Sequence, residues 1–537
     1  MRTSTTTQDS AVADTVPDAV PGAADARHSE SPDPDEHRDT DAAPETAGGR
    51  RSRSGLIQGA AALSAVAAGT TAVAAALPAA GGPGGELTAD ARVVLSVFAA
   101  ALLCWTLTRA DDAFIGMAAV AVLVAAGILP YGDVLGLLGS ETVWLLVAAG
   151  VMAAGIEASG LPARAARALI VRAGSVRALV HLVTVGVVLT ALAIPSTSGR
   201  AALALPVFLA LARVFAERPA VVRALALVFP TTILLSAIAS LIGAAAHLIG
   251  DEILRGMTGS GIGFGHWLLL GVPLAVVSAH LAAELVLLLM TRRADRRGRL
   301  TLDPEQLGDP AHGDSASGGD VPGRLTNAQW RMLALVAVVV ALWCTESLHG
   351  VPPTAVALLG ALAATAPGFG TTPMTAALKS VPWPLLVFMI SAAALADALV
   401  RTGAAEWAAQ AALAGAAGTD STVVLAAVIA VSAASHLVLQ SRSARAAVLV
   451  PAVIPLASAV GLDPAAAVFA STAAAGFCHT LTSSAKPVAL FSDLPDGSPT
   501  YGRADLLRLS ALLGPLMVAL VLGAAVFVWP HLGLPLR

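Results

Sequence analysis

Two short polar segments, each set within a long apolar stretch, carry the residues best suited to binding a ligand. Residues 196–202 read STSGRAA and residues 441–447 read SRSARAA, and after an apolar triplet each is followed by a proline. The two segments stand 245 residues apart. Hydroxyl and guanidinium groups donate hydrogen bonds, and the planar arginine fork matches two oxygens of a carboxylate or sulfate. The pattern therefore indicates a duplicated anion site.

The surrounding chain has the composition of a membrane protein. Hydrophobic residues make up 56% of the 537 and charged residues 13%, against roughly 45–50% and about 25% in an ordinary soluble domain. Apolar stretches of about 17 to 25 residues recur after residue 55, and each is long enough to cross a bilayer as a helix. A barrel strand would alternate polar and apolar residues, and these stretches do not. We therefore expect an all-α polytopic membrane protein.

The apolar pattern predicts eleven transmembrane helices and two re-entrant hairpins. The hairpins, residues 178–216 and 420–460, hold the polar segments midway and do not change sides. The predicted transmembrane helices cover residues 56–80, 92–108, 113–130, 142–160, 222–250, 265–291, 328–347, 352–367, 383–401, 462–490 and 505–530.

Positive charges set the predicted orientation. Arg50, Arg51 and Arg53 precede the first helix and place the N-terminus in the cytoplasm. The helix count then makes residues 292–327 a cytoplasmic linker, which opens with five arginines, and leaves the C-terminus outside. The two hairpins enter from opposite sides. We therefore predict two inverted-topology repeats, residues 56–291 and 328–537, whose broken helices meet near the midplane.

The first 55 residues differ from the rest. They hold 11 of the 36 acidic residues but only 6 of the 32 Lys and Arg, which leaves 25 acids and 26 bases in the remainder. Large apolar residues are scarce in this stretch. Such a segment buries too little surface to fold, so we expect a disordered acidic cytoplasmic tail over residues 1–55.

The polar segments resemble the hairpin tips of the divalent-anion/sodium symporter family, the carboxylate and sulfate permeases of the ion transporter superfamily. In that family each repeat has a hairpin tipped by Ser-Asn-Thr within S-N-T-x-T-A-A, and a later broken helix with a G-T-P-P-N-like turn. The resemblance covers roughly residues 90–530. It implies elevator-type alternating access, a homodimer, sodium bound at the hairpin tips, and substrate carboxylates held by the two motifs.

Carried over residue by residue, the resemblance assigns candidate binding residues. Those near a candidate sodium site are Ser196, Ser198 and Gly243. The candidate substrate-binding residues are Ser196, Thr197, Ser198, Arg200, Ser441, Arg442, Ser443, Arg445, Ser483, Ser484 and Lys486.

Arg442 is the most informative departure from the family motif, because it replaces an asparagine. A fixed cation next to a sodium ion in a low-dielectric site costs several kcal/mol of repulsion. We therefore expect the guanidinium to take the place of sodium and to contact the anion. Alternatively, the arginines bind carbonyls freed at the tips or pair with Glu157 or Asp397, and the serines are ordinary helix caps.

Two histidines, His247 and His479, stand beside the breaks in the later helices. Because histidine titrates near neutral pH, both are candidate proton-coupling residues. The alternative is that each is a buried core residue whose hydrogen bonds are satisfied.

Together these features predict a secondary active transporter for small anions such as di- or tricarboxylates or sulfate, with sodium coupling reduced or absent. The alternatives are an arsenite or cation/proton exchanger of the same superfamily, or a transport-dead receptor or scaffold. An HExxH motif, a nucleophile elbow and a P-loop are all missing from the sequence, which argues against an enzyme or ATPase. We expect a bacterial-type inner membrane location, no enzymatic cofactor, sodium or a proton as coupling ion, and no nucleic-acid partner.

Overall fold

The computed structural model describes residues 47–77, 87–108, 110–298, 300, 325–413, 419–495, 497–498 and 500–537. The chain divides into a unit of residues 1–56 and a larger unit of residues 57–537, which contains the whole candidate site. Most of the predicted tail and of the predicted linker lies outside the described residues, although helix α1 (Ala47–Ala76) begins within the tail boundary.

The first half of the larger unit is built of helices alone among its described residues. Its elements are α2 (Ala89–Leu107), α3 (Asp112–Ala125), α4 (Tyr131–Gly136), η1 (Leu137–Gly139), α5 (Glu141–Ala158), α6 (Leu161–Ile170), α7 (Val176–Thr190), α8 (Thr197–Val214), α9 (Pro219–Ser236), η2 (Ala237–Ala239), η3 (Leu241–Gly243), α10 (Ala245–Thr258), α11 (Phe264–Met290) and α12 (Arg293–Arg297).

The second half repeats this order with shorter helices near its end. Its elements are α13 (Asn327–Cys344), α14 (Glu346–His349), α15 (Pro353–Thr365), α16 (Met374–Ala377), η5 (Leu378–Ser380), α17 (Trp383–Arg401), α18 (Ala404–Leu413), α19 (Ser421–Ala434), η6 (Ser435–Leu437), α20 (Arg442–Ala459), α21 (Pro464–Ala474), η7 (Thr482–Ser484), α22 (Lys486–Leu490), α23 (Arg503–Gly523), η8 (Ala524–Val528) and η9 (Trp529–Leu532).

The correspondence between the halves is closest around the polar segments. Helices α8 and α20 start and end 245 residues apart, and the starts of α7 and α19 and of α9 and α21 keep the same offset. Each of α8 and α20 carries an internal proline at the matching position, Pro206 and Pro451. The 245-residue spacing seen in the sequence is therefore a spacing of whole helices.

The predicted helical class is confirmed, and the described residues include no β-strand. Nine described helices are long and apolar enough to span a membrane, and they include α8 and α20, the second arms of the predicted hairpins. Helices α3, α15 and α21 fall at predicted spans but are shorter. The number of spans and the inverted relation of the repeats therefore stay predictions.

Local capping explains where the hairpin helices begin. The Ser175 hydroxyl accepts a hydrogen bond from the Ala178 amide at the start of α7, and an aspartate, Asp420, caps α19 at the matching position. A first-turn proline follows at Pro219 of α9 and at Pro464 of α21. Side-chain caps satisfy backbone amides that have no partner inside the helix, so these boundaries follow from local sequence.

The break between α9 and α10 is fixed by close backbone approaches. A Cβ on Gly243 would lie 2.2 Å from the Ala237 carbonyl oxygen, and a Cβ on Gly271 of α11 would lie 2.0 Å from the Ile238 carbonyl oxygen. The Trp267 indole N–H donates to that Ile238 oxygen at 3.1 Å. Helix α11 therefore packs directly on the unwound segment and satisfies one of its carbonyls.

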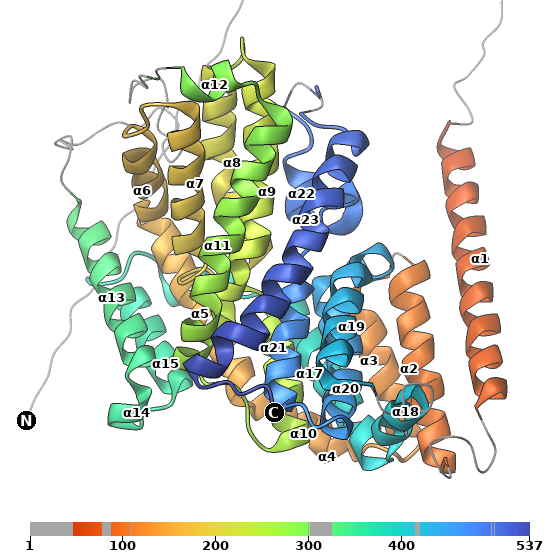
Figure 1. Ribbon diagram of the computed structural model, residues 1–537. Coiled ribbons are helices and arrows are strands. Elements are labelled where there is room, and N and C mark those ends of the chain that lie inside the picture. Colours follow the sequence, from red (N-terminus) through yellow and green to blue (C-terminus); the bar gives the residue numbers. More distant parts are fainter. Residues whose placement is uncertain are drawn as a thin grey trace, which may run out of the picture. The chain divides into compact units, whose positions relative to one another are not determined.

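The two halves exchange elements at the breaks (Figure 1). Helix α10 of the first half packs against α17, α20 and α21 of the second, while the short α22 of the second half packs against α8 and α9 of the first. Helices α7 and α8 both pack on α9, and α19 and α20 both pack on α21. Each break therefore lies close to the other half's hairpin arm.

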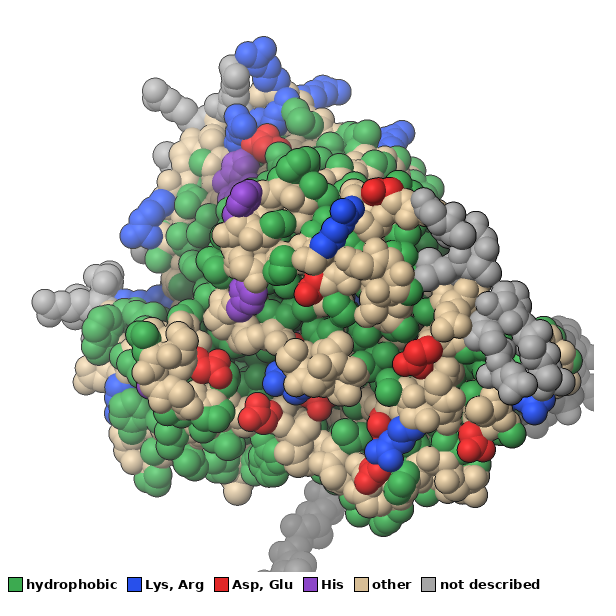
Figure 2. All heavy atoms as spheres, turned by 60° about the horizontal axis from the view of Figure 1, so that its bottom comes forward, with side chains coloured by type: hydrophobic (Ala, Val, Ile, Leu, Met, Phe, Trp, Pro, Cys, Tyr) green, Lys and Arg blue, Asp and Glu red, His purple; other side chains and the backbone are tan. Residues whose placement is uncertain are grey.

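The described surface exposes many large apolar side chains, and Figure 2 shows hydrophobic side chains spread over one face among scattered charged ones. Phe114, Trp330, Leu362 and Phe527 are each more than half exposed. Contiguous apolar surface of this kind marks contact with an apolar partner. Because nine helices among the described residues are apolar and of spanning length, that partner is the hydrocarbon of a bilayer.

Candidate functional site

Each hairpin tip presents a serine-capped helix start. The Ser196 hydroxyl accepts from the Gly199 amide at 3.2 Å, and the Ser441 hydroxyl accepts from the Ala444 amide at 3.3 Å. Both serines are half-buried, and Ser198 is exposed. The two predicted binding serines thus serve as helix caps, and the N-termini of α8 and α20 bring positive dipole ends to the tips.

Arg200 is buried and fully engaged within the first half. Its Nε donates to the Thr190 hydroxyl at 3.0 Å, its Nη1 to the Ile233 carbonyl at 3.1 Å, and its Nη2 to the Val187 carbonyl at 2.7 Å and the Ser236 hydroxyl at 2.6 Å. These partners belong to the end of α7 and the end of α9. Arg200 therefore ties the hairpin to the helix break, and each of its side-chain nitrogens has a protein partner.

Arg445 holds the matching position on α20 but is only partly engaged. Its Nη1 donates to the Ala475 carbonyl at 3.0 Å and to the Phe477 carbonyl at 3.5 Å, just beyond the end of α21. Its Nε and Nη2 are buried and have no hydrogen-bond partner among the described residues. Both arginines thus donate to backbone carbonyls, Arg200 within α7 and α9 and Arg445 just beyond α21, but only Arg445 has side-chain nitrogens without a partner among the described residues.

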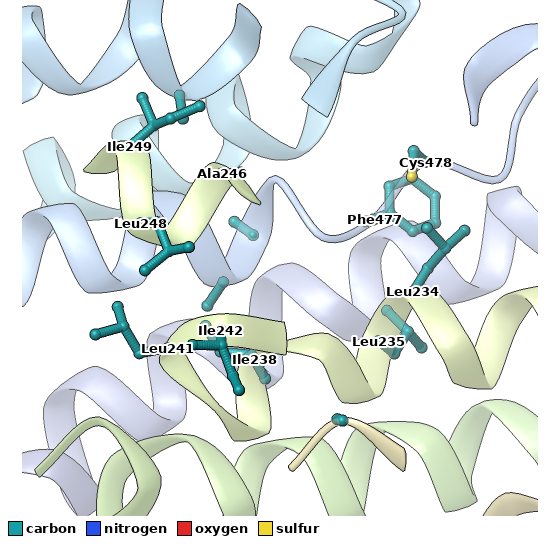
Figure 3. Close-up of a cluster of buried hydrophobic side chains, with 14 of the residues drawn as sticks. Leu234, Leu235, Ile238, Leu241, Ile242, Ala246, Leu248, Ile249, Phe477 and Cys478 are labelled. Carbon is teal, nitrogen blue, oxygen red and sulfur yellow. The ribbon is translucent and has the colours of Figure 1, made fainter. Parts of the chain in front are cut away.

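Arg442 reaches from the second half into the first. Its Nη2 lies 3.1 Å from Nε2 of His247, and its Nη1 donates to the Leu234 carbonyl at 3.4 Å. Its Nε is buried without a partner in the described part of the chain. The fork passes over Gly476, where a Cβ would lie 3.1 Å from Nη2. Figure 3 shows Leu234 beside Phe477 and Cys478, the segment that follows α21.

The two predicted histidines are both buried, and their contacts differ. His247 has both ring nitrogens engaged, Nδ1 with the Ser240 carbonyl at 3.1 Å and Nε2 with Arg442. His479 accepts from the Cys478 amide at Nδ1, and its Nε2 has no partner among described residues. His479 lies close enough to Arg442 and Arg445 to interact with both electrostatically.

The remaining predicted residues lie at the second broken turn or near it. Ser483 and Lys486 are exposed, and the buried Ser484 hydroxyl accepts from the Leu481 amide at 3.1 Å. Lys486 lies within electrostatic range of Asp112, which also lies beside the Ser441 hydroxyl. This second group includes an acid, so it is less suited to an anion than the arginine group.

Two residues near the tips escaped the sequence analysis. Asp112 stands at the start of α3, one residue ahead of a predicted span. His436 packs edge-on against the Phe477 ring at a centroid distance of 5.1 Å, and its Nε2 lies 2.8 Å from the Thr480 hydroxyl. The sequence signal that could have identified His436 is a single histidine in the middle of a predicted hairpin.

The structure thus brings Arg442, Arg445, His247 and His479 together, and engages Arg200 elsewhere. Of the alternatives for the arginines, contact with freed carbonyls is observed for Arg200 and Arg445. Asp397 pairs instead with Arg401 at 2.6 Å. No group of three or more His, Cys, Asp or Glu side chains suited to a metal occurs among the described residues.

Two cavities lie away from this cluster. One of about 380 Å³ is lined by Asp133, Asp397 and Arg401 on α4 and α17. The other, of about 660 Å³, lies between α6, α7, α8 and α13 and is lined almost wholly by apolar side chains, with Arg200 at its wall. The nitrogens of Arg200 are engaged with protein, so the second cavity suits apolar chains rather than anions.

Comparison with known proteins identifies the family. The model of the citrate transporter family matches residues 98–474. The chain belongs to that family. It is therefore a multi-pass membrane transporter and not an enzyme. Membership of the divalent-anion/sodium symporter family stays a prediction, as does each assigned site residue.

Solved structures also resemble this chain. The crystal structure of the YdaH transporter of Alcanivorax borkumensis, whose topology is described as unusual, shares 19% identity with this chain, covers 75% of it and 88% of its own chain, and gives a TM-score of 0.47. Comparison with curated protein sequences gave no match.

Proposed function

We propose that this citrate transporter family member is a secondary active transporter of small polycarboxylates, citrate among them, and that Arg442, Arg445 and His479 bind the anion. The observation that carries the proposal is a set of buried nitrogens near the second hairpin tip that have no partner among the described residues: Nε of Arg442, Nε and Nη2 of Arg445, and Nε2 of His479. Family membership supplies the transport activity and the substrate class.

The energetic argument rests on burial. A buried donor without a partner costs about 1–3 kcal/mol, and more when it is charged. Four such nitrogens on three neighbouring side chains are costly together unless something accepts from them. A carboxylate accepts several hydrogen bonds and offsets the two guanidinium charges, so it matches this cluster in geometry and in charge.

Backbone dipoles add to the same effect. Helices α8 and α20 both begin at the tips, and a helix N-terminus favours an anion by about 0.3–1 kcal/mol or more when partly buried. The Ser196 hydroxyl accepts from the Gly199 amide, so its own hydrogen is free to point toward a substrate oxygen, whereas the Ser441 hydroxyl hydrogen-bonds to Asp112.

The transport cycle we propose is alternating access by two inverted repeats of elevator type. The constant offset of α7, α8 and α9 from α19, α20 and α21 supports a duplication, and the exchange of α10 and α22 between halves supports a shared site. We further propose a homodimer in a bacterial-type inner membrane, with the N-terminus cytoplasmic and the C-terminus outside.

Coupling follows from Arg442. Its guanidinium takes the position of the motif asparagine, and a sodium ion beside it would be repelled by several kcal/mol. We therefore expect transport with little or no sodium dependence, and a proton as the alternative coupling ion.

The test is counterflow in proteoliposomes loaded with citrate, other di- and tricarboxylates, sulfate or arsenite, with and without sodium. We expect saturable exchange of citrate or a related polycarboxylate that persists without sodium. Exchange of arsenite alone would contradict the substrate class, and a protein that folds but exchanges none of them would be a receptor or scaffold.

A further inference from the structure

His247 has its two ring nitrogens committed to partners of known type. The Nδ1 atom lies 3.1 Å from the Ser240 carbonyl oxygen and the Nε2 atom lies 3.1 Å from Nη2 of Arg442. The ring is fully buried and packs against Trp267 at a centroid distance of 5.2 Å. Ser240 belongs to the unwound segment between α9 and α10, so the ring links that segment to the second half.

The partners determine the protonation state. A carbonyl oxygen only accepts, so Nδ1 must carry the hydrogen; a guanidinium only donates, so Nε2 must keep its lone pair. The imidazole is therefore neutral, with its hydrogen on Nδ1. A doubly protonated ring would place two donors face to face at Nε2 and Nη2.

We propose that His247 is a positioning residue: as a neutral ring it offers the Nε2 lone pair to Arg442 and so holds the Arg442 fork toward the anion. This rests on the proposed function only for the identity of the ligand. It replaces the expectation that His247 carries the coupling proton, since a ring that must stay neutral to hold Arg442 does not cycle between charge states without losing that contact.

The charges around His247 favour the neutral ring. Arg442 on α20 and Arg200 on α8 both act on it electrostatically, and both are positive. Helix α20 also carries Arg445, and two nitrogens of this arginine have no partner among the described residues. Helix α21 also packs on α10 and carries no charged residue.

The nearby acids are already paired. Helix α17 packs on α10 and carries Asp397 and Arg401, which bond to each other at 2.6 Å. On α10 itself Asp251 bonds to Arg255 at 3.0 Å, and Glu252 accepts from the Thr142 hydroxyl. A proton on His247 would therefore add a third positive charge beside Arg442 and Arg200, with these acids engaged elsewhere.

Two substitutions at His247 separate the effect of the Nε2 acceptor from the effect of side-chain volume. His247→Gln keeps an acceptor at the position of Nε2 but does not titrate, whereas His247→Leu removes the acceptor. His531→Gln, on the exposed η9 residue, is the matched control. Citrate binding to the purified full-length protein is measured at about pH 8, above the ordinary histidine pKa of about 6.5.

We expect His247→Leu to weaken citrate binding about tenfold at about pH 8. His247→Gln should bind nearly as the wild type does, because it keeps an acceptor for Arg442. Unchanged affinity in His247→Leu, or an affinity in His247→Gln as low as that of His247→Leu, would overturn the proposal.

A second measurement does not depend on the ligand. The melting temperature of the anion-free protein should fall by more in His247→Leu than in His247→Gln or His531→Gln, because only His247→Leu leaves Arg442 without its acceptor. If this holds while no tested anion binds the wild type, the proposed function fails and the positioning role stands. If citrate binds but His247→Leu and His247→Gln melt at the same temperature, the positioning role fails.

Discussion

Arg200 and Arg445 occupy matching positions, yet their surroundings give them different roles. Arg200 bonds to Thr190, Val187, Ile233 and Ser236, all in its own half. Arg445 keeps the carbonyl contacts beyond its neighbouring helix but leaves Nε and Nη2 unpartnered. We therefore propose that Arg200 mainly stabilises the fold and that Arg445 binds the ligand.

This difference is testable with one type of substitution at both sites. Arg200→Gln should lower the melting temperature strongly, because two buried carbonyls and two hydroxyls lose donors, at about 1–3 kcal/mol for each buried group left unpaired. Arg445→Gln should leave more of the stability and lose at least about tenfold in citrate affinity. Thermal unfolding and citrate binding are measured on both, with exposed Arg213→Gln as the control. Equal losses of stability and equal affinities in the two variants would contradict the assignment.

Arg442 allows a test of coupling. Arg442→Asn introduces the asparagine of the symporter motif that this tip resembles and should weaken citrate binding at least about tenfold, since a hydrogen bond to a charged group contributes about 1.5–3 kcal/mol. Arg442→Lys should recover only part of this, because an ammonium keeps the charge without the fork. Uptake by wild type and both variants is measured at fixed sodium and without sodium. Wild-type uptake that disappears without sodium would show that the guanidinium does not take the place of the ion.

At the scale of helices, much of the fold could be predicted from the sequence. The hairpin arms α7, α8, α19 and α20 begin at Ser or Asp caps, and caps act through local hydrogen bonds. The segment 222–250, predicted as one span with a small polar break, is α9, two short turns and α10. The extent of that break could not be predicted, because it depends on how α11, which follows α10, packs back onto it.

The glycines at this break should be sensitive to substitution. Gly243→Ala would bring a Cβ to 2.2 Å from the Ala237 carbonyl oxygen, so the turn must shift. We expect a loss of stability of roughly 1–3 kcal/mol, typical of overpacking in a tight site. Gly256→Ala on α10, which meets nothing within 4 Å, is the matched control and should be neutral or slightly stabilising, since alanine favours helix by about 1 kcal/mol. Thermal unfolding of both proteins checks this. A neutral Gly243→Ala would mean that the break is less constrained than its backbone contacts indicate.

At the scale of the whole molecule, the site depends on contacts that no local pattern encodes. The Arg442–His247 contact joins residues 195 apart in the sequence, and it forms because α10 packs among helices of the second half. Sequence reasoning found both residues from their polarity in apolar surroundings. It could not pair them, and it grouped Lys486 with them although the structure places that side chain near Asp112.

The predicted homodimer can be tested at the exposed faces of α13 and α15. Helices α13 and α15 expose Trp330, Leu333, Leu359 and Leu362, which suit a bilayer or a second copy. Native mass spectrometry in mild detergent should show a dimer. Trp330→Ala together with Leu333→Ala should raise the monomer fraction if these helices form the interface, with Leu348→Ala on α14 as the control. A wild type that is monomeric throughout would end the prediction.

The one-sided reach of Arg442 has a consequence for the order in which the protein is made. Every hydrogen-bond partner of Arg200 lies between Val187 and Ser236, so this arginine is satisfied as soon as the ribosome has delivered the first half to the membrane. The hydrogen-bond partners of Arg442 are Leu234 and His247, and both are synthesised before it. The chain thus emerges in the sequence that its buried charges require, and a permuted chain that delivered α20 before α9 and α10 would expose that guanidinium to lipid until its partners arrived.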